Sequence, residues 1–96
     1  MQFITISRRY SERFPEEAFT SKREEEAERV RVLYSEGYVR QIWFRGDEAG
    51  ACILWEAENE AKVRQLVESL PFYKAGLLDL QHVIPALPYA GFGPRL

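Results

Sequence analysis

The chain has 96 residues, the size of one small domain, and its 13 basic and 15 acidic residues give a net charge of −2. This balance argues against a nucleic-acid-binding surface, which needs a clustered basic excess. A single cysteine and a single histidine exclude an internal disulfide and disfavour a structural zinc site.

No apolar run approaches the ~20 residues of a membrane span, and the N-terminus lacks a signal-peptide pattern. We therefore expect a cytoplasmic protein that binds neither membranes nor nucleic acid.

The first half of the chain predicts a strand, a helix and a second strand. Residues 1–7, "MQFITIS", are β-prone. From about residue 15 to residue 36, apolar residues recur with helical spacing, and Gly37 suits the left-handed cap that ends a helix. The second strand is expected over residues 38–45.

The second half predicts a turn at 46–50, a strand over 51–57, a helix and a last strand over about 77–84. Asn59 is the expected N-terminal cap of this helix. Its expected buried stripe is Val63, Leu66, Val67 and Leu70.

The order β-α-β-β-α-β is that of the ferredoxin-like α+β fold, an antiparallel sheet with two helices on one face. We expect this domain over residues 1–86, followed by a Pro/Gly-rich C-terminal tail over 87–96.

The hairpin at residues 39–57 is apolar on both faces. With a five-residue turn, opposed residue numbers sum to 96. One face then carries Arg40, Ile42, Phe44, Cys52, Leu54 and Glu56. The other carries Gln41, Trp43, Arg45, Ala51, Ile53 and Trp55. Because two helices cover only one face, we expect the face with Trp43 and Trp55 to be buried against a second sheet, in a homodimer or a higher homo-oligomer.

The segment "EGYVRQIWFRGDEAGACILWEAENEAKVRQLVESLPFY" resembles the core of the muconolactone isomerase family, in the dimeric α+β barrel superfamily. The resemblance covers roughly residues 30–73 and rests on ordered spacing. The matching features are the Gly37 turn, Arg40-x-Ile42-Trp43, the Gly46 turn, Trp55-Glu56 and Ser69-Leu70-Pro71-Phe72. A departure is Phe44, where the family commonly has a second arginine.

This resemblance implies a small, oligomeric enzyme without a cofactor. The family's namesake moves a proton to shift the double bond of a carboxylated lactone.

Glu26 falls inside the apolar stripe of the first helix, close to Val30 and Arg23 on the helical wheel. One interpretation is an i,i+3 ion pair with Arg23 at the edge of the sheet. The other is a catalytic general base whose pKa is raised by burial.

Arg40 and Glu56 are expected opposite each other. They form either a cross-strand ion pair or, with Arg40 as a clamp for a substrate carboxylate, part of a binding site. If their face is the one under the helices, Glu26 approaches them and the three charges form a cluster.

His82 is expected on the same strand face as Leu78, Leu80 and Ile84, either packed or as a proton shuttle. Trp43 and Tyr73 are candidate pocket walls as well as candidate core or interface residues.

Three functions remain open. The first is acid/base isomerisation of a small carboxylated ring compound, with Glu26 or His82 as the proton carrier and Arg40 as the anchor. The second is a cofactor-free monooxygenase with a pocket walled by Trp43, Trp55 and Tyr73. The third is a non-catalytic oligomeric module that binds a metabolite or a partner, and a fully packed helix–sheet interface would favour it.

Overall fold

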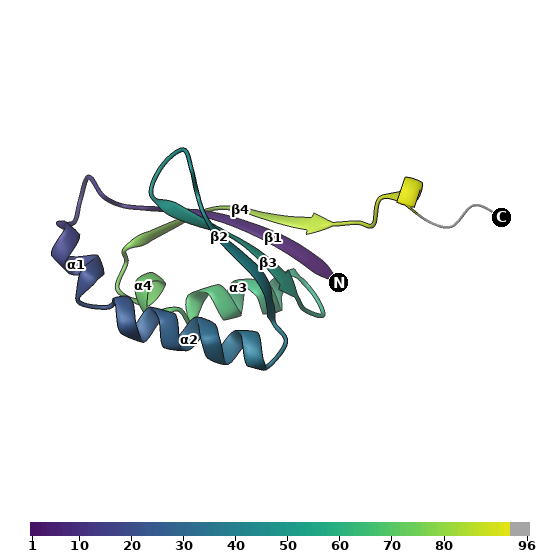
Figure 1. The fold of residues 1–96 in the computed structure, drawn as a ribbon, viewed down its shortest axis with the longest axis horizontal. Helices are drawn as coiled ribbons and strands as arrows, with labels where there is room; N and C mark the ends of the chain where they lie inside the picture. Colours follow the sequence, from purple (N-terminus) through teal and green to yellow (C-terminus); the bar gives the residue numbers. More distant parts are fainter. Residues whose placement is uncertain (93–96) are drawn as a thin grey trace.

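The computed structural model describes residues 1–92, which form one antiparallel sheet with helices on one of its faces (Figure 1). The strands lie in the order β2-β3-β1-β4. They are β1 (Gln2–Arg9), β2 (Val39–Phe44), β3 (Gly50–Glu56) and β4 (Leu78–Ala86). The helices are α1 (Glu16–Thr20), α2 (Arg23–Ser35), α3 (Glu60–Glu68), α4 (Pro71–Lys74) and the 3-10 turn η1 (Ala90–Phe92). The ferredoxin-like α+β fold expected from the sequence is confirmed.

The helix expected over residues 15–36 is interrupted at Ser21 and Lys22, which separate α1 from α2. The Ser21 hydroxyl donates a hydrogen bond to the Ala18 carbonyl at 3.2 Å. Such local bonds compete with the helical pattern and favour a break. After α2 the chain turns at Gly37, which has the expected left-handed conformation, with φ of 87°.

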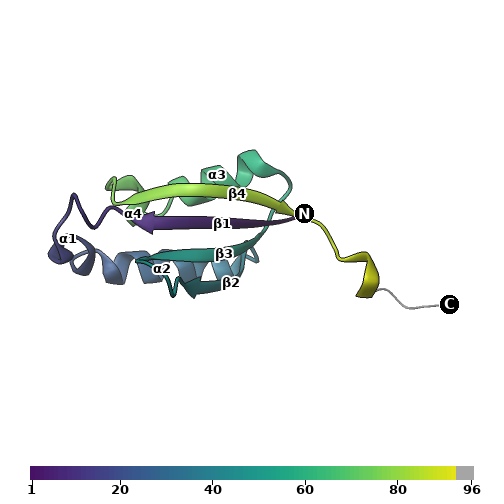
Figure 2. The same cartoon turned by 90° about the horizontal axis from the view of Figure 1, so that it is seen from above.

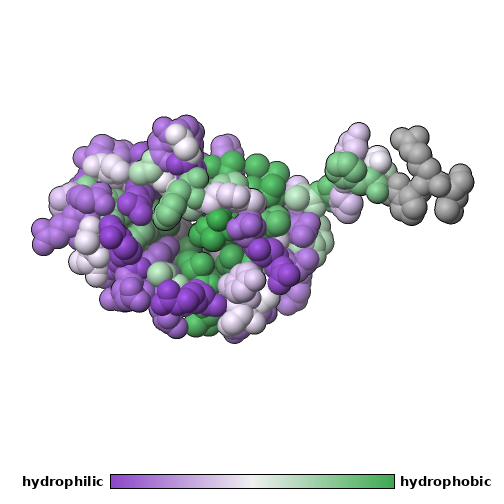
Figure 3. Space-filling view, in the orientation of Figure 1, coloured by the Kyte–Doolittle hydropathy of each residue, from purple (hydrophilic) through white to green (hydrophobic). Residues whose placement is uncertain are grey.

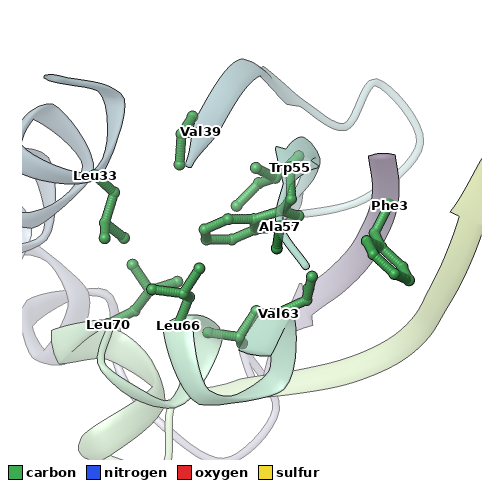
Figure 4. Close-up of a cluster of buried hydrophobic side chains, with 10 residues drawn as sticks. Phe3, Leu33, Val39, Trp55, Ala57, Val63, Leu66 and Leu70 are labelled. Carbon is green, nitrogen blue, oxygen red and sulfur yellow. The ribbon is translucent and has the colours of Figure 1, made fainter. Parts of the chain in front are cut away.

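Helix α3 begins and packs as expected. The side-chain oxygen of Asn59 accepts a hydrogen bond from the backbone N–H of Lys62 at 2.9 Å and caps the helix. The apolar stripe of α3 and the residue that follows it, Leu70, are buried in the main core (Figure 4). Pro71 does not simply end this helix but starts α4, where a missing N–H carries little penalty.

The β2–β3 hairpin is shifted by one residue from the expected register. Trp43 lies opposite Cys52, and Ile42 lies opposite Ile53. The turn is one residue shorter than expected, because the backbone N–H of Arg45 donates to the Gly50 carbonyl at 3.1 Å.

A one-residue shift moves every side chain to the other face of a strand relative to its partner. Trp55 therefore faces the helices and is completely buried, whereas Trp43 lies on the opposite face and is 50% exposed. The prediction that the two tryptophans share the uncovered face was wrong. The indole N–H of Trp55 donates to the Thr5 hydroxyl at 2.8 Å in the core.

Strand β4 is irregular beside β1. Ile6 pairs with His82 and Ser7 pairs with Leu80, so Gln81 is an extra residue between the two pairs. This bulge separates His82 from the face that carries Leu80, and the expected alignment of His82 with Leu78 and Leu80 was wrong.

In the described part of the chain, one face of the sheet has no helix over it, as the α+β order predicted (Figure 1). We call it the open face; it carries Ile4, Ile6, Trp43, Cys52, Leu54, His82 and Ile84. At one end, the Arg45 guanidinium binds Asp47 at 2.7 Å and Gln81 at 2.6 Å. These contacts tie the β2–β3 turn to β4, at the far edge of the sheet.

Beyond β4 the chain leaves the body of the domain as an arm (Figure 2). Leu87, Tyr89 and Phe92 on this arm are all largely exposed. Of the tail expected over 87–96, residues 93–96 lie outside the described part. Within residues 1–92, no helix has the length and apolar character needed to cross a membrane.

The buried Trp55–Thr5 hydrogen bond gives a test of the observed register. We expect Thr5→Val to lower the free energy of unfolding by about 1–3 kcal/mol, because it leaves the indole N–H without an acceptor. Thr20→Val, at an exposed position, is the matched control and should change stability by less than about 0.5 kcal/mol. Urea denaturation of both variants measures the difference, and equal effects would contradict the buried bond.

Candidate functional site

A cavity of about 350 Å³ lies between α2 and the strands, on the face of the sheet that the helices cover. Apolar side chains form most of its wall: Ala27, Val30, Ile42, Phe44, Ile53, Leu70, Phe72 and Leu78. Its polar residues are Ser7, Arg9 and Glu26, with Arg23 and Arg31 also on the α2 side. Figure 3 shows apolar surface exposed between the strands and α2, with hydrophilic residues around it.

Residue sizes explain why the gap between helix and sheet is filled at one end and open at the other. Trp55 fills the gap toward the C-terminal end of β3. At the N-terminal end of the same strand, Gly50 and Ala51 line the cavity, and Ala27 lines it from α2. A larger residue at position 50 is excluded, since any Cβ there would collide with the Ser7 carbonyl.

Glu26 lies on the inner side of α2 and lines the cavity, as its place in the apolar stripe suggested. One carboxylate oxygen, Oε1, accepts a hydrogen bond from the backbone N–H of Phe72 at 3.0 Å. No ion pair between Glu26 and Arg23 forms in the described part of the chain, so the interpretation as a structural i,i+3 pair does not hold.

The pKa of Glu26 is raised from its ordinary value. Burial disfavours the charged carboxylate and is the largest effect, while the Phe72 hydrogen bond and the nearby positive charge of Arg9 act in the opposite direction. A carboxyl group with a raised pKa is a stronger base when ionised, and it can also hold a proton closer to neutral pH.

Arg9 is a cavity residue that the sequence analysis missed. It ends β1, and its guanidinium lies 4.9 Å from the ring centroid of Phe19 and 5.4 Å from that of Phe72. The signal was present in the alternation of Phe3, Thr5, Ser7 and Arg9, which all face the helices. The expected strand ended at Ser7, and so its last inward-facing position was not considered.

Arg40 and Glu56 do not reach the cavity. Arg40 is exposed and sits in the irregular pairing between Val39 and Gln41. Glu56 accepts an ion-pair contact from the N-terminal amine of Met1 at 2.7 Å. The expected cluster of Glu26, Arg40 and Glu56 is not formed, because the shifted register removes the Arg40–Glu56 pairing.

The other predicted site residues also lie elsewhere. Trp43 and His82 are on the open face and exposed. Tyr73 lies in α4 and lines a separate surface hollow with Arg64 and Asp79. Of the six residues proposed from the sequence, Glu26 alone lines the cavity.

A metal site is not apparent in residues 1–92, where no group of three or more His, Cys, Asp or Glu side chains is placed to hold an ion.

The fold agrees with comparisons to known proteins. The family model described as muconolactone delta-isomerase matches residues 1–90. The chain belongs to the muconolactone delta-isomerase family. The sequence resemblance had rested on residues 30–73, and the match extends it over the first strand and helix.

A solved structure shares the fold of this family member. It is 5-chloro-2-hydroxyhydroquinone dehydrochlorinase from Burkholderia phenoliruptrix, in complex with 2,5-dihydroxybenzoquinone. The TM-score is 0.70 with 18% sequence identity, over 98% of this chain and 100% of the other. No curated protein sequence matches this chain.

The raised pKa of Glu26 predicts a pH-dependent stability difference. The pKa of Glu26 is higher in the folded state than in the unfolded chain, so folding favours the protonated carboxyl group. The stability that this preference contributes is complete below the unfolded value of about 4.3 and is lost as the pH rises through the folded value. Glu26→Gln does not ionise and still offers an acceptor to Phe72. Its melting temperature should exceed that of the wild type at about pH 8, and the difference should vanish near pH 4.

Thermal melts followed by circular dichroism across this range provide the measurement. Glu25→Gln is the matched control, since Glu25 is exposed on the same helix. A wild type that is more stable than Glu26→Gln at pH 8 would contradict the raised pKa.

Proposed function

We propose that this protein is a cofactor-free enzyme that uses Glu26 to move a proton on a small carboxylated ring compound bound in the cavity. The observation that carries this proposal is the placement of a partly buried carboxyl group, with a raised pKa, on the wall of an otherwise apolar cavity. Isomerisation, the reaction of the family's namesake, is the reaction we propose.

The chemistry needs one group that takes a proton from a ring carbon and returns it at another. A single carboxylate does both if it stays over one face of the ring during the double-bond shift. Oε1 of Glu26 is oriented by the Phe72 amide, which leaves the second oxygen, Oε2, to accept the proton. The apolar wall limits competing water and keeps the carboxylate basic.

A monooxygenase pocket walled by Trp43, Trp55 and Tyr73 has less support. Trp55 is buried in the core, Trp43 lies on the open face, and Tyr73 lines a different hollow. These residues share no cavity within residues 1–92.

A purely binding module was expected to have a closed helix–sheet interface, and the cavity beside Glu26 favours an enzyme instead. The solved dehydrochlorinase of the same fold holds a small quinone ring. That ligand supports a ring compound of similar size as the substrate class.

We also propose that the open face pairs with the same face of a second copy, in a homodimer or a higher homo-oligomer. Apolar residues there, including Ile6, Trp43 and Leu54, are not covered by any helix within residues 1–92. The exposed apolar residues of the C-terminal arm support contact with another copy as well.

The enzymatic proposal is tested by Glu26→Gln with a carboxylated enol lactone as substrate. We expect kcat/KM to fall about 100- to 10,000-fold, the range for loss of a general acid–base group. Glu25→Gln should retain the wild-type rate. In the wild type, kcat/KM should rise with pH through a pKa above the ordinary glutamate value, and a full rate in Glu26→Gln would refute the assignment.

The assembly is tested by placing a charge on the open face. Leu54→Glu should shift light scattering from a multiple of the chain mass to the mass of one chain, because a buried unpaired carboxylate opposes sheet pairing. Ala61→Glu, at an exposed site on α3, is the control. A wild-type protein that is already monomeric at micromolar concentration would exclude the homodimer.

A further inference from the structure

The side chain of Arg9 is held by aromatic rings and directed to the cavity. Its guanidinium carbon lies 4.9 Å from the ring centroid of Phe19 and 5.4 Å from that of Phe72. The two rings meet edge to face, with centroids 5.8 Å apart and planes at 85°. Aromatic rings attract a guanidinium through its positive charge and take up none of its N–H donors in conventional hydrogen bonds, so these donors stay available to an anion.

The N–H edge of Arg9 has no acceptor in residues 1–92. No hydrogen bond and no ion pair joins its side chain to any of them. Some arginines are paired: Arg31 is bonded to Glu28 at 2.6 Å, and Arg45 to Asp47 at 2.7 Å. The side chains of Arg13, Arg23 and Arg40 are exposed and, like that of Arg9, have no acceptor in residues 1–92. Arg9 is only partly exposed and lines the cavity, so its charge and donors are directed at a space that a ligand can fill.

Glu26 and Arg9 meet at Phe72. The Phe72 ring packs on the Arg9 guanidinium, and the Phe72 amide donates to the Glu26 carboxylate. A proton carrier and a free cation are thus fixed to the same residue on one wall of the cavity. A ring bound there can present an anionic group to Arg9 and a carbon to Glu26 at the same time.

We propose that Arg9 is the anion anchor of this cavity, binding through its N–H edge the carboxylate or phenolate oxygen of the ring compound on which Glu26 acts. This inference rests on the proposed function and assigns to Arg9 the role that the sequence suggested for Arg40. The fork of a guanidinium suits the two oxygens of a carboxylate, and a single phenolate oxygen accepts from the same donors.

Anchoring at Arg9 also connects binding to the proton on Glu26. The positive charge of Arg9 lowers the pKa of Glu26 against the larger effect of burial. An anion bound to Arg9 offsets that charge and brings a negative charge near the carboxylate, and both changes raise the pKa. The bound substrate therefore makes Glu26 a stronger base, and binding takes up protons at a pH between the free and bound pKa values.

The test uses isothermal titration calorimetry with two matched pairs of probes. Benzoate is compared with neutral benzamide, and 4-nitrophenolate with neutral 4-nitroanisole, so that carboxylate and phenolate recognition are separated. In the wild type we expect at least one anion to bind about 10-fold or more tightly than its neutral partner. Arg9→Gln should weaken binding of that anion by about 10- to 100-fold and leave binding of its neutral partner nearly unchanged.

Arg13→Gln is the matched control, because Arg13 also stacks on a ring, that of Tyr10 at 4.3 Å, but does not line the cavity. It should bind both anions as the wild type does. Should Arg9→Gln fail to fold, Arg9→Lys keeps the charge without the fork and should show a smaller loss for benzoate. Wild-type protein that does not prefer either anion to its neutral partner overturns the proposal, whatever the variants do.

Proton uptake is measured by repeating the benzoate titration in buffers with different ionisation enthalpies. The binding heat should depend on the buffer in the wild type and not in Glu26→Gln, and a buffer-independent wild-type heat overturns the connection to Glu26. Loss of turnover in Glu26→Gln does not depend on these results. Conversely, the preference for an anion would persist if the proposed reaction were wrong. Failure of the Arg9 proposal can therefore be distinguished from failure of the proposed function of Glu26.

Discussion

The Trp55 indole, enclosed between sheet and helices and hydrogen-bonded to Thr5, is the contact on which the other features of the domain depend. It is the largest of the fully buried side chains, and it fills the space between the two layers toward one end of β3. The layers are thereby held apart by the width of an indole along their length. Where the strands carry Gly50 and Ala51, the same separation leaves a cavity. The same distance between the sheet and the helices therefore accommodates a bulky buried residue at one end and leaves a cavity at the other.

Glu26 faces this cavity at a cost to folding, because the carboxylate is removed from bulk water. The Phe72 amide and the charge of Arg9 recover only part of that loss, and the pKa stays raised. Purely structural positions rarely retain such a residue, since a glutamine of the same shape avoids the penalty. A site that takes and returns protons needs a group whose pKa is shifted in this way by burial.

The sequence predicted the order of elements, the Asn59 cap and the buried face of α3, because these depend on local chemistry and periodicity. It also predicted that Glu26 faces inward. The prediction of the hairpin register was wrong. Whether the turn has four or five residues is decided by the hydrogen bond from the Arg45 N–H to the Gly50 carbonyl and not by composition. Every inference that used the register, including the pairing of Arg40 with Glu56, failed with it.

Two further site features depend on tertiary contacts that periodicity does not encode. The bulge at Gln81 changes the face of His82, and it arises from how β4 meets β1. Arg9 is held beside the cavity by Phe19 and Phe72, which are distant in the sequence and meet only when α1 and α4 pack together.

The hydrogen bond that orients Glu26 comes from the main chain of residue 72 and not from its side chain. Substitutions at that position can change the size and polarity of the cavity wall while the amide continues to hold the carboxylate, with proline as the exception. Under the proposed function, a change at residue 72 can therefore alter which ring is bound without disturbing the proposed proton carrier, Glu26. On that proposal, specificity is separated from chemistry, and single substitutions of a cavity side chain suffice to change the substrate.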